Sequence, residues 1–506
     1  MKKLIILLTV LLVLGSACKK DFLNVDETNP NTASAVPANL VLPAALNSIA
    51  ARIDDPRNYE FCYLWFGAWS ISNGYVPPRN LTEYNLLNSG YQAIWDNSYL
   101  ILQNLDYVEK ASMASTEKNF RAIAIIMKVY LYHNLVDTYG NIPYSQALNT
   151  AGGILKPAYD DAQTIYEDLA VKIDTAINLI QKATITDDAV GSSDIIYQGD
   201  MGKWARFANT IKLRMLMNQE FMSGRATYIT GALATTASVG YLGAGEGAML
   251  NPGYLQSTNK MSPLWELFYK QDNSQQADGL GYYVANQDAC TFLTTNNDPR
   301  KLRFFQPITG STTTIQGNYF GGYEQLPVPQ TSKIGPGLLQ GYNQSAPILT
   351  DFESLFLQAE AALKGFIPGN PKAFYESAVT QSVIYMGQTS SLDPSTYVPL
   401  TATDAATYLA QPLALVNYDS SPDPLKAIIT QKWIALNGIS PMPIWTDYRR
   451  TGFPDFISWS IDPGKLSPTP PVRLFYPQTE VTTNNDNVLA QGTITLTSPK
   501  IFWQNR

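Results

Sequence analysis

The sequence predicts a mainly α-helical protein, built from antiparallel helical hairpins, with a long loop-rich insertion and a few short strands. Three observations support this fold class. Apolar residues recur every three or four positions in several segments, and Gly or Pro marks the helix ends in the second half of the chain. Between the helical blocks, residues 223–349 lose this period and become rich in Gly, Thr, Gln, Asn, Pro and aromatics. Short strands are expected at 302–306 and 493–497.

The N-terminus has the pattern of a secretory leader. Two lysines precede an apolar run over residues 4–14, and small residues follow at 15–17. The run is too short to span a membrane, because a spanning helix needs about 20 apolar residues. Cys18 comes directly after the small residues, which is typical of a bacterial lipobox, although Gly15 stands where most lipoboxes carry Leu. We expect Cys18 to carry the lipid anchor; the alternative is a secreted protein cleaved before it.

Three segments of the first half are expected to be helices. Residues 120–136 are apolar on nearly every face, which predicts a central, buried helix. In residues 165–180 the apolar side chains fall on one helix face and the charged ones on the other, which predicts an amphipathic helix. Asp160 or Asp161 is expected to cap it. Residues 202–220 repeat the helical period with tryptophan, phenylalanine and methionine on one side.

A second helical block begins near residue 351. One helix is expected to end at Gly365, and Asn370 with Pro371 is expected to start the next one. Small residues on both helices favour close, tetratricopeptide-like packing, although an unrelated helical hairpin would have the same local pattern. A further helix is expected over 423–438.

Composition excludes several classes of function. A formal net charge of −7 disfavours nucleic acid as a partner. Only 15% of the residues are charged, and the 30 Tyr and 9 Trp supply rings suited to neutral, hydroxyl-rich ligands. His133 is the only histidine, which excludes a His-rich metal site, so we expect it to be packed in a helix. We assign no metal-binding residues and expect no cofactor. Cys62 and Cys290 are interpreted as separate buried thiols, with a disulfide as the alternative.

Seven segments together resemble the SusD/RagB family of outer-membrane lipoproteins from Bacteroidota. They are "CKKDFLNV" after the leader, "DTYGNIPYSQAL" (137–148), "KWARFANTIKLRML" (203–216), "FLQAEAALKG" (356–365), "QKWIALNG" (431–438), "WTDYRRTGFP" (445–454) and "RLFYPQTEVTTNN" (473–485). The resemblance implies tetratricopeptide-like helical pairs that carry a loop-rich ligand face. It also implies a surface lipoprotein that captures oligosaccharides, or in some members peptides, and delivers them to a SusC-type TonB-dependent transporter.

The shared motifs have structural interpretations of their own. Arg449 and Arg450, with Asp447, are expected to tie the C-terminal segment to the helical body through ion pairs and carbonyl contacts. "YGNIPY" is expected to form a turn. The predicted organisation is a signal peptide (1–17), a lipidated tether (18–40) and one SusD-like domain (41–506), which divides into a helical core (41–222 and 350–440), a ligand face (223–349) and a C-terminal segment (441–506).

The ligand site is expected where aromatic and polar side chains meet on irregular segments. A sugar ring packs its C–H face on an aromatic ring, while its hydroxyls bond amide and charged groups. Residues 63–80 offer both kinds of group, with Trp65 and Phe66 expected to face the core. The insertion adds further rings, among them Tyr269, Tyr282 and Tyr319. The predicted ligand-binding residues are Trp69, Asn73, Tyr75, Arg79, Trp265, Tyr283 and Tyr323.

Two other classes of function compete with a binding protein. A glycoside hydrolase would need two carboxyl groups facing across a cleft, and the sequence carries no recognisable catalytic signature, so we expect no enzyme activity. A scaffold that only docks a partner protein and binds no small ligand would need no exposed aromatic side chains on its loop-rich face. The sequence leaves open whether the ligand is a glycan or a peptide, whether calcium is bound, and the stoichiometry with the transporter.

Overall fold

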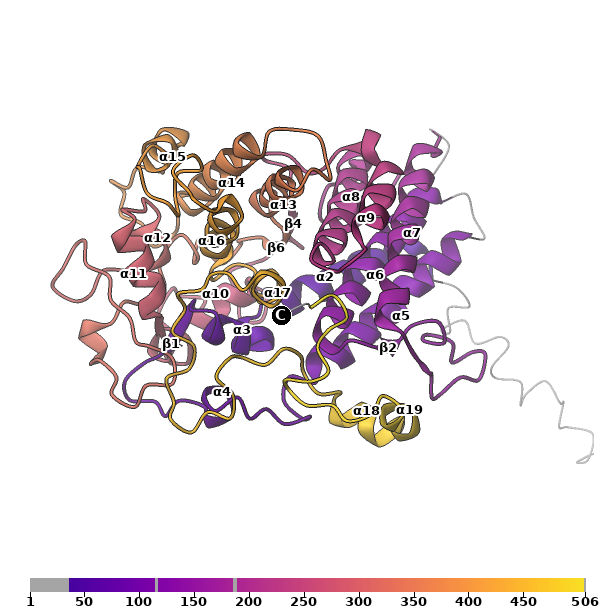
Figure 1. Ribbon diagram of the computed structural model, residues 1–506, viewed down its shortest axis with the longest axis horizontal. Coiled ribbons are helices and arrows are strands. Elements are labelled where there is room, and N and C mark those ends of the chain that lie inside the picture. The colour runs from indigo at the N-terminus through magenta and orange to yellow at the C-terminus, as the bar shows by residue number, and fades with distance from the viewer. Residues whose placement is uncertain (1–35, 114–116, 185–188, 505–506) are drawn as a thin grey trace, which may run out of the picture.

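The computed structural model describes residues 36–113, 117–184 and 189–504. Figure 1 shows the long helices between residues 93 and 234 gathered on one side of the molecule and those between residues 351 and 436 on the other, with α17 (Pro441–Thr451) between them. Cys18 and most of the predicted tether lie outside the described residues. The helical body begins at Ala38, slightly before the boundary expected at residue 41.

The first group of helices packs in chain order, α5 on α6, α6 on α7 and α7 on α8. The expected cap is present, because the Asp161 side chain accepts a hydrogen bond from the backbone N–H of Thr164 at 2.9 Å. The group comprises α2 (Ala38–Ile53), α5 (Ala93–Met113), α6 (Lys118–Tyr139), α7 (Ala162–Gln181), α8 (Met201–Asn218) and α9 (Ala226–Ala234).

Helix α6 is the central helix of this group, as its composition predicts. It packs against α5 on one side and α7 on the other, and most of its residues are buried. It ends at Tyr139, and the next residue, Gly140 with a φ of 79°, begins the turn predicted for "YGNIPY".

The second group also consists of paired helices. Helices α13 and α14 pack along each other, and Asn370 accepts hydrogen bonds from the backbone N–H groups of Lys372 and Ala373, as expected for a helix start with proline next. These pairs confirm the predicted tetratricopeptide-like architecture. The group comprises α13 (Asp351–Leu363), α14 (Pro371–Met386), α15 (Ala402–Leu409), α16 (Pro424–Leu436) and α17 (Pro441–Thr451).

The remaining elements are short. The short helices are α3 (Glu60–Trp65), α4 (Arg79–Thr82), α10 (Pro263–Phe268), α11 (Gln287–Thr295), α12 (Lys301–Phe304), α18 (Gln478–Thr483) and α19 (Asn485–Leu489), with single turns η2 (Pro56–Tyr59), η3 (Gly191–Ser193), η4 (Ala237–Val239), η5 (Ala277–Gly281) and η6 (Val328–Gln330).

The part of the chain that the structure describes contains three antiparallel strand pairs, two of which join segments that are distant in sequence. Strand β1 (Trp69–Ile71) pairs with β5 (Tyr283–Ala285), β2 (Ile142–Pro143) with β3 (Tyr159–Asp160), and β4 (Ala248–Leu250) with β6 (Ala346–Leu349). The expected strands at 302–306 and 493–497 are wrong. The first segment forms α12 and a single bridge from Phe305 to Ile334, and the second is irregular.

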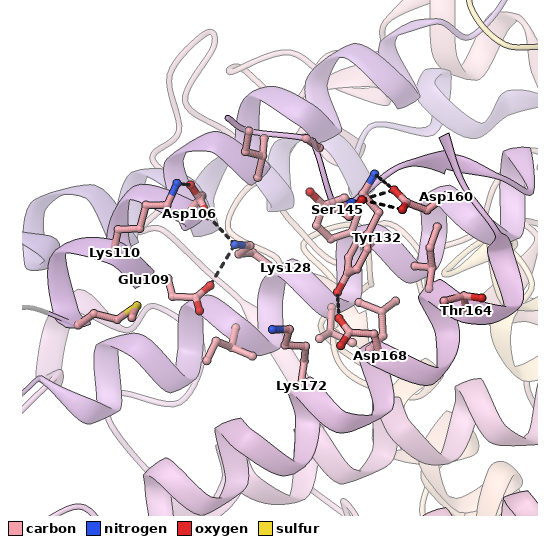
Figure 2. A pocket seen from close by; sticks show the side chains of 18 residues that line it. Asp106, Glu109, Lys110, Lys128, Tyr132, Ser145, Asp160, Thr164, Asp168 and Lys172 are labelled. Carbon is pink, nitrogen blue, oxygen red and sulfur yellow. Dashed lines mark hydrogen bonds and ion pairs between the residues drawn. The ribbon is translucent and has the colours of Figure 1, made fainter. Parts of the chain in front are cut away.

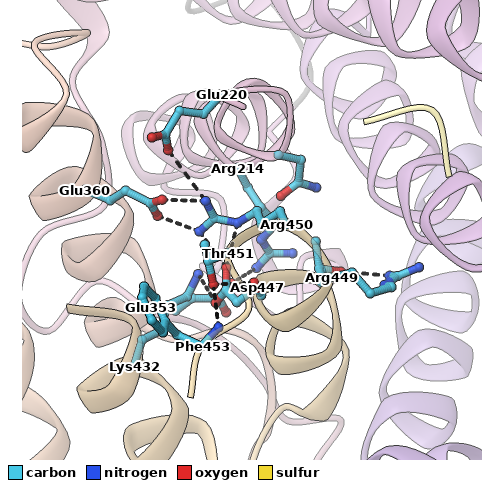
Figure 3. Close-up of polar contacts among 12 residues, drawn as sticks. Arg214, Glu220, Glu353, Glu360, Lys432, Asp447, Arg449, Arg450, Thr451 and Phe453 are labelled. Carbon is cyan, nitrogen blue, oxygen red and sulfur yellow. Dashed lines mark hydrogen bonds and ion pairs between the residues drawn. The ribbon is translucent and has the colours of Figure 1, made fainter. Parts of the chain in front are cut away.

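The C-terminal segment is tied to the helical body through a buried arginine. Arg450 on α17 is 1% exposed, and its guanidinium binds both carboxylate oxygens of Glu360 on α13. It also binds Asp447 at 2.7 Å, and Figure 3 shows these side chains converging between the helices. Because removing a buried charge from its partner is costly, this contact fixes α17 against α13.

The neighbouring arginine makes the carbonyl contacts that the sequence predicts. Arg449 donates to the backbone oxygens of Asp137 at 2.6 Å and Val472 at 2.9 Å. Trp503, near the C-terminus, donates its indole N–H to the Asp137 carboxylate at 2.9 Å. The C-terminal segment is therefore anchored at the end of α6. Of the helices in the described part of the chain, none combines the length and the apolar character needed to cross a membrane.

Candidate functional site

The strand pair β1–β5 brings together the irregular segments that carry the predicted site. The backbone continues past β1 with Ser72, whose N–H donates to the carbonyl of Tyr282 at 2.8 Å. The Asn318 side chain donates to the carbonyl of Ile71 at 3.0 Å and accepts from the N–H of Leu326 at 3.0 Å. Residues 72–79 and 319–326 therefore lie beside each other, although they are far apart in sequence.

Four of the seven predicted site residues line one open cavity between these segments. Its volume is about 560 Å³, and the C-terminal segment closes its wall with Asp462. Gly74, with a φ of 105°, bends the chain so that the residues after it reach the cavity. The four predicted residues are Asn73, Tyr75, Arg79 and Tyr323.

Two aromatic rings at this cavity are open to solvent. Tyr75 is 39% exposed and Tyr323 is 60% exposed. Tyr75 packs edge-on against Tyr282, with centroids 5.2 Å apart and an interplanar angle of 89°. Rings held at one edge and open elsewhere can stack on the apolar face of a ligand. Tyr319, 42% exposed, lies close by in the chain.

Polar groups surround the two rings. The Asn73 amide donates to the carbonyl of Gln325 at 3.0 Å, which closes the cavity between the two segments. Arg79 exposes 71% of its side chain and lies 3.6 Å from Glu83 through Nε, so most of its guanidinium donors face solvent. Hydrogen bonding to the Tyr323 hydroxyl raises the pKa of Arg79 above its usual value. The cavity can therefore both stack on a ligand and donate hydrogen bonds to it.

Asp462 is a lining residue that sequence reasoning missed. Its carboxylate is 3% exposed and accepts hydrogen bonds from the Thr82 hydroxyl at 2.7 Å, the Tyr323 hydroxyl at 3.0 Å and the N–H of Gly464 at 2.8 Å. Burial acts to raise its pKa, but these three donors and Arg79 outweigh burial and hold the pKa below the usual range. No local motif marks this residue, because its partners come from three distant segments.

Trp69 was expected to offer its ring to a ligand, and this expectation is wrong. Its side chain is 0% exposed, because β1 pairs with β5 and places Trp69 opposite Ala285 in the core. The indole stacks on Tyr63 with centroids 4.4 Å apart and planes 6° apart. Trp65 and Phe66 are buried, as predicted.

Trp265 and Tyr283 are also core residues rather than ligand contacts. Trp265 is 0% exposed and stacks on Tyr269 at 4.6 Å. Tyr283 is 3% exposed and donates its hydroxyl hydrogen bond to Glu60 at 2.9 Å. A ring enclosed in this way has no face left for a ligand, so both predictions are corrected.

A larger cavity, of about 580 Å³, lies between α5, α6 and α7. Figure 2 shows that several of its charged groups have partners within the protein: Lys128 binds Asp106 at 2.7 Å and Glu109 at 3.0 Å. Its two tyrosines, Tyr132 and Tyr144, pack edge-on against each other at 4.8 Å. Because most of its charged groups have partners and its two tyrosine rings pack against each other, this cavity is less suited to a sugar than the one at Tyr75 and Tyr323.

The reactive residue types lie in the core, as the sequence predicts. His133 is 1% exposed and its Nε2 lies 2.9 Å from the Asp137 carboxylate. Cys62 and Cys290 are free and buried, and burial raises the pKa of both thiols. The interpretation as separate buried thiols is therefore confirmed. Among residues 36–113, 117–184 and 189–504, no group of three or more His, Cys, Asp or Glu side chains could hold a metal ion.

Comparison with protein families gives one match over most of the chain. The SusD-like family model, described as "Starch-binding associating with outer membrane", matches residues 30–477. This chain belongs to the SusD-like family. The resemblance seen in the sequence motifs is confirmed. A comparison with curated proteins finds no match.

Several solved structures share the fold of this SusD-like chain. A chitin-binding protein has a TM-score of 0.76 at 22% identity and covers 93% of this chain and 100% of its own. A SusD-like protein from Bacteroides thetaiotaomicron has a TM-score of 0.73 at 23% identity, covering 93% and 99%. A chitin-binding SusD homologue from Flavobacterium johnsoniae has a TM-score of 0.73 at 21% identity, also covering 93% and 99%.

Proposed function

We propose that this chain is a cell-surface lipoprotein that captures oligosaccharides at the cavity of Tyr75 and Tyr323. We further propose that it delivers them to a SusC-type TonB-dependent transporter in the outer membrane. The observation that carries the proposal is the pairing of two solvent-open rings with the Asn73 amide and the Arg79 guanidinium around one cavity. A sugar needs both kinds of contact.

The cavity is suited to capture without chemistry. Each stacked ring contributes about 1 kcal/mol, so the contacts are individually weak and add over several sugar units. A glycoside hydrolase would need a carboxylic acid with a raised pKa. Asp462 instead has a lowered pKa and is occupied by three hydrogen-bond donors, so it does not suit the role of general acid.

Attachment to the membrane is proposed through Cys18. The family description includes association with the outer membrane, and the leader ends in small residues directly before Cys18. A lipid on this residue would hold the helical body at the surface through the residues that precede α2.

A glycan is the proposed ligand class, because the family description names starch and two structural neighbours are described as chitin-binding. Isothermal titration of residues 19–506 with a chitin hexasaccharide, maltohexaose and a mixed peptide pool tests this assignment. We expect at least one oligosaccharide to bind and the peptides not to bind. Binding of peptides alone would replace the glycan proposal with peptide capture.

The site itself is tested with Tyr75→Ala and Tyr323→Ala. Loss of about 1 kcal/mol of stacking should raise Kd about fivefold for each variant. Tyr107→Ala is the matched control, because Tyr107 on α5 is also 39% exposed but lies outside the cavity. Equal affinity in all three variants would remove the cavity from the proposal.

A further inference from the structure

Asp462 links three parts of the chain that meet at the proposed ligand cavity. Its carboxylate oxygens accept hydrogen bonds from the Thr82 hydroxyl at the end of α4, from the Tyr323 hydroxyl in the loop 319–326, and from the backbone N–H of Gly464 in the C-terminal segment. Thr82 and Asp462 are 1% and 3% exposed, while Tyr323 is 60% exposed. The hydroxyl of an otherwise open tyrosine is thus held by a buried carboxylate.

We propose that Asp462 is a positioning residue, which fixes the Tyr323 ring in the orientation that a ligand stacks on. This inference rests on the proposed function and names the residue that sets the geometry of the same site. A ring on a loop can turn through several rotamers, and ordering it on binding would cost affinity. A hydrogen bond from the hydroxyl to an ionised carboxylate removes that freedom before the ligand arrives.

The backbone around Asp462 is suited to this role, because it is held in place independently of the ligand. The N–H of Ser460 donates to the Tyr84 hydroxyl at 2.8 Å, and the N–H of Ile461 donates to the carbonyl of Phe320 at 2.9 Å. Gly321 approaches this segment so closely that an added Cβ would lie 2.3 Å from the Ser460 hydroxyl oxygen. The C-terminal segment therefore sets the position of the loop that carries Tyr323.

The charged state of the carboxylate supports the same assignment. Three donors and the nearby Arg79 keep Asp462 ionised at neutral pH, since its pKa lies below the usual range of an aspartate. Glu324, which also lines the cavity, is exposed and is free to face solvent or ligand. Asp462 accepts a hydrogen bond from the Tyr323 hydroxyl, so Asp462 acts on the ligand through the Tyr323 ring.

The test is a double-mutant cycle on oligosaccharide binding by the full body, residues 19–506. Tyr323→Phe keeps the ring and removes its anchor, and Asp462→Asn removes the charge with almost no change of shape. Each should weaken binding of the chitin hexasaccharide or maltohexaose about tenfold, the value of one hydrogen bond to a charged group. The double variant should bind the oligosaccharide no more weakly than the weaker-binding single variant, because both substitutions remove the same hydrogen bond.

Several results would overturn the inference. Tyr323→Phe with wild-type affinity shows that the anchor is dispensable, and a double variant weakened by the product of the two effects shows that the hydroxyl contacts the ligand itself. If Tyr323→Ala weakens binding while Tyr323→Phe does not, the proposed function stands and the positioning role fails. If Tyr323→Ala also binds normally, the cavity and the positioning role fail together. Tyr107→Phe, which removes a hydroxyl bonded to the backbone of Val36, is the matched control.

A second measurement needs no ligand. Hydrogen–deuterium exchange of residues 319–326 should be faster in Asp462→Asn than in wild type, while exchange in α6 stays the same. Unchanged exchange in the loop would show that Asp462 does not hold it, whatever the binding data give.

Discussion

Arg450 should be among the side chains whose loss destabilises this protein most. It is 1% exposed, binds both oxygens of Glu360, binds Asp447 at 2.7 Å and lies 3.6 Å from Glu220. Arg450→Met fills the same space but leaves the Glu360 and Asp447 carboxylates without their shared cation. Breaking a buried ion pair by removing one partner costs about 3–5 kcal/mol. We expect the unfolding free energy to fall by that amount.

The assay is urea denaturation followed by tryptophan fluorescence at pH 7, with Lys426→Ala as the control. Lys426 also pairs with an acid, Asp455 at 2.7 Å, but their side chains are 30% and 48% exposed. Exposed pairs contribute about 0–1 kcal/mol, so the control should stay close to wild type. If Arg450→Met loses no more than the control, the buried network does not hold α17 against α13 and the reasoning is refuted.

Three further predictions follow from the same contacts. Burial and the neighbouring Glu360 raise the pKa of Glu220 to about 8. The stability that this raised pKa provides is therefore full below about pH 4.5 and is lost as the pH rises through 8. Urea denaturation at several pH values should give a flatter plot of unfolding free energy against pH for Glu220→Gln than for wild type, and parallel plots would contradict this. Trp69→Ala should cost about 3–5 kcal/mol because it empties a core position, and thermal melting checks it; a nearly unchanged melting temperature would mean that Trp69 is a surface residue after all. Gly321→Ala should weaken oligosaccharide binding in the same titration, because its φ of 81° and the nearby Ser460 leave no room for a side chain; wild-type affinity would show that the loop adapts.

The helices could be predicted because their signals are local. In α7 the apolar residues repeat along one face, and Asp161 at its start accepts a hydrogen bond only three residues away. Asn370 and Pro371 mark the start of α14 in the same way. Such patterns depend on neighbouring residues alone, so one sequence is enough to place these elements.

The site was only partly predictable, because exposure is decided by distant pairing. Tyr75 and Trp69 lie six positions apart in the same aromatic stretch, yet β1 pairs with β5 and buries only Trp69. Composition marks both rings as candidates and cannot separate them. Asp462 gave no signal, since Thr82 and Tyr323 reach it only in the folded chain.

The wrong strand at 302–306 has a similar cause. Phe304 and Phe305 are both 0% exposed, so the alternation that a half-exposed strand needs is absent. Arg303 binds Asp393 and the carbonyl of Met386 at 2.9 Å, and these distant contacts accompany the helical turn of α12. Tertiary contacts have overridden the local preference here.

The most direct test of ligand capture at the cavity of Tyr75 and Tyr323 is a crystal structure of residues 19–506 with a bound oligosaccharide. We expect a sugar ring against Tyr75 or Tyr323, with its hydroxyls within hydrogen-bond distance of Asn73 or Arg79. Density for the sugar in the cavity between α5, α6 and α7, with the cavity at Tyr323 empty, would contradict this expectation.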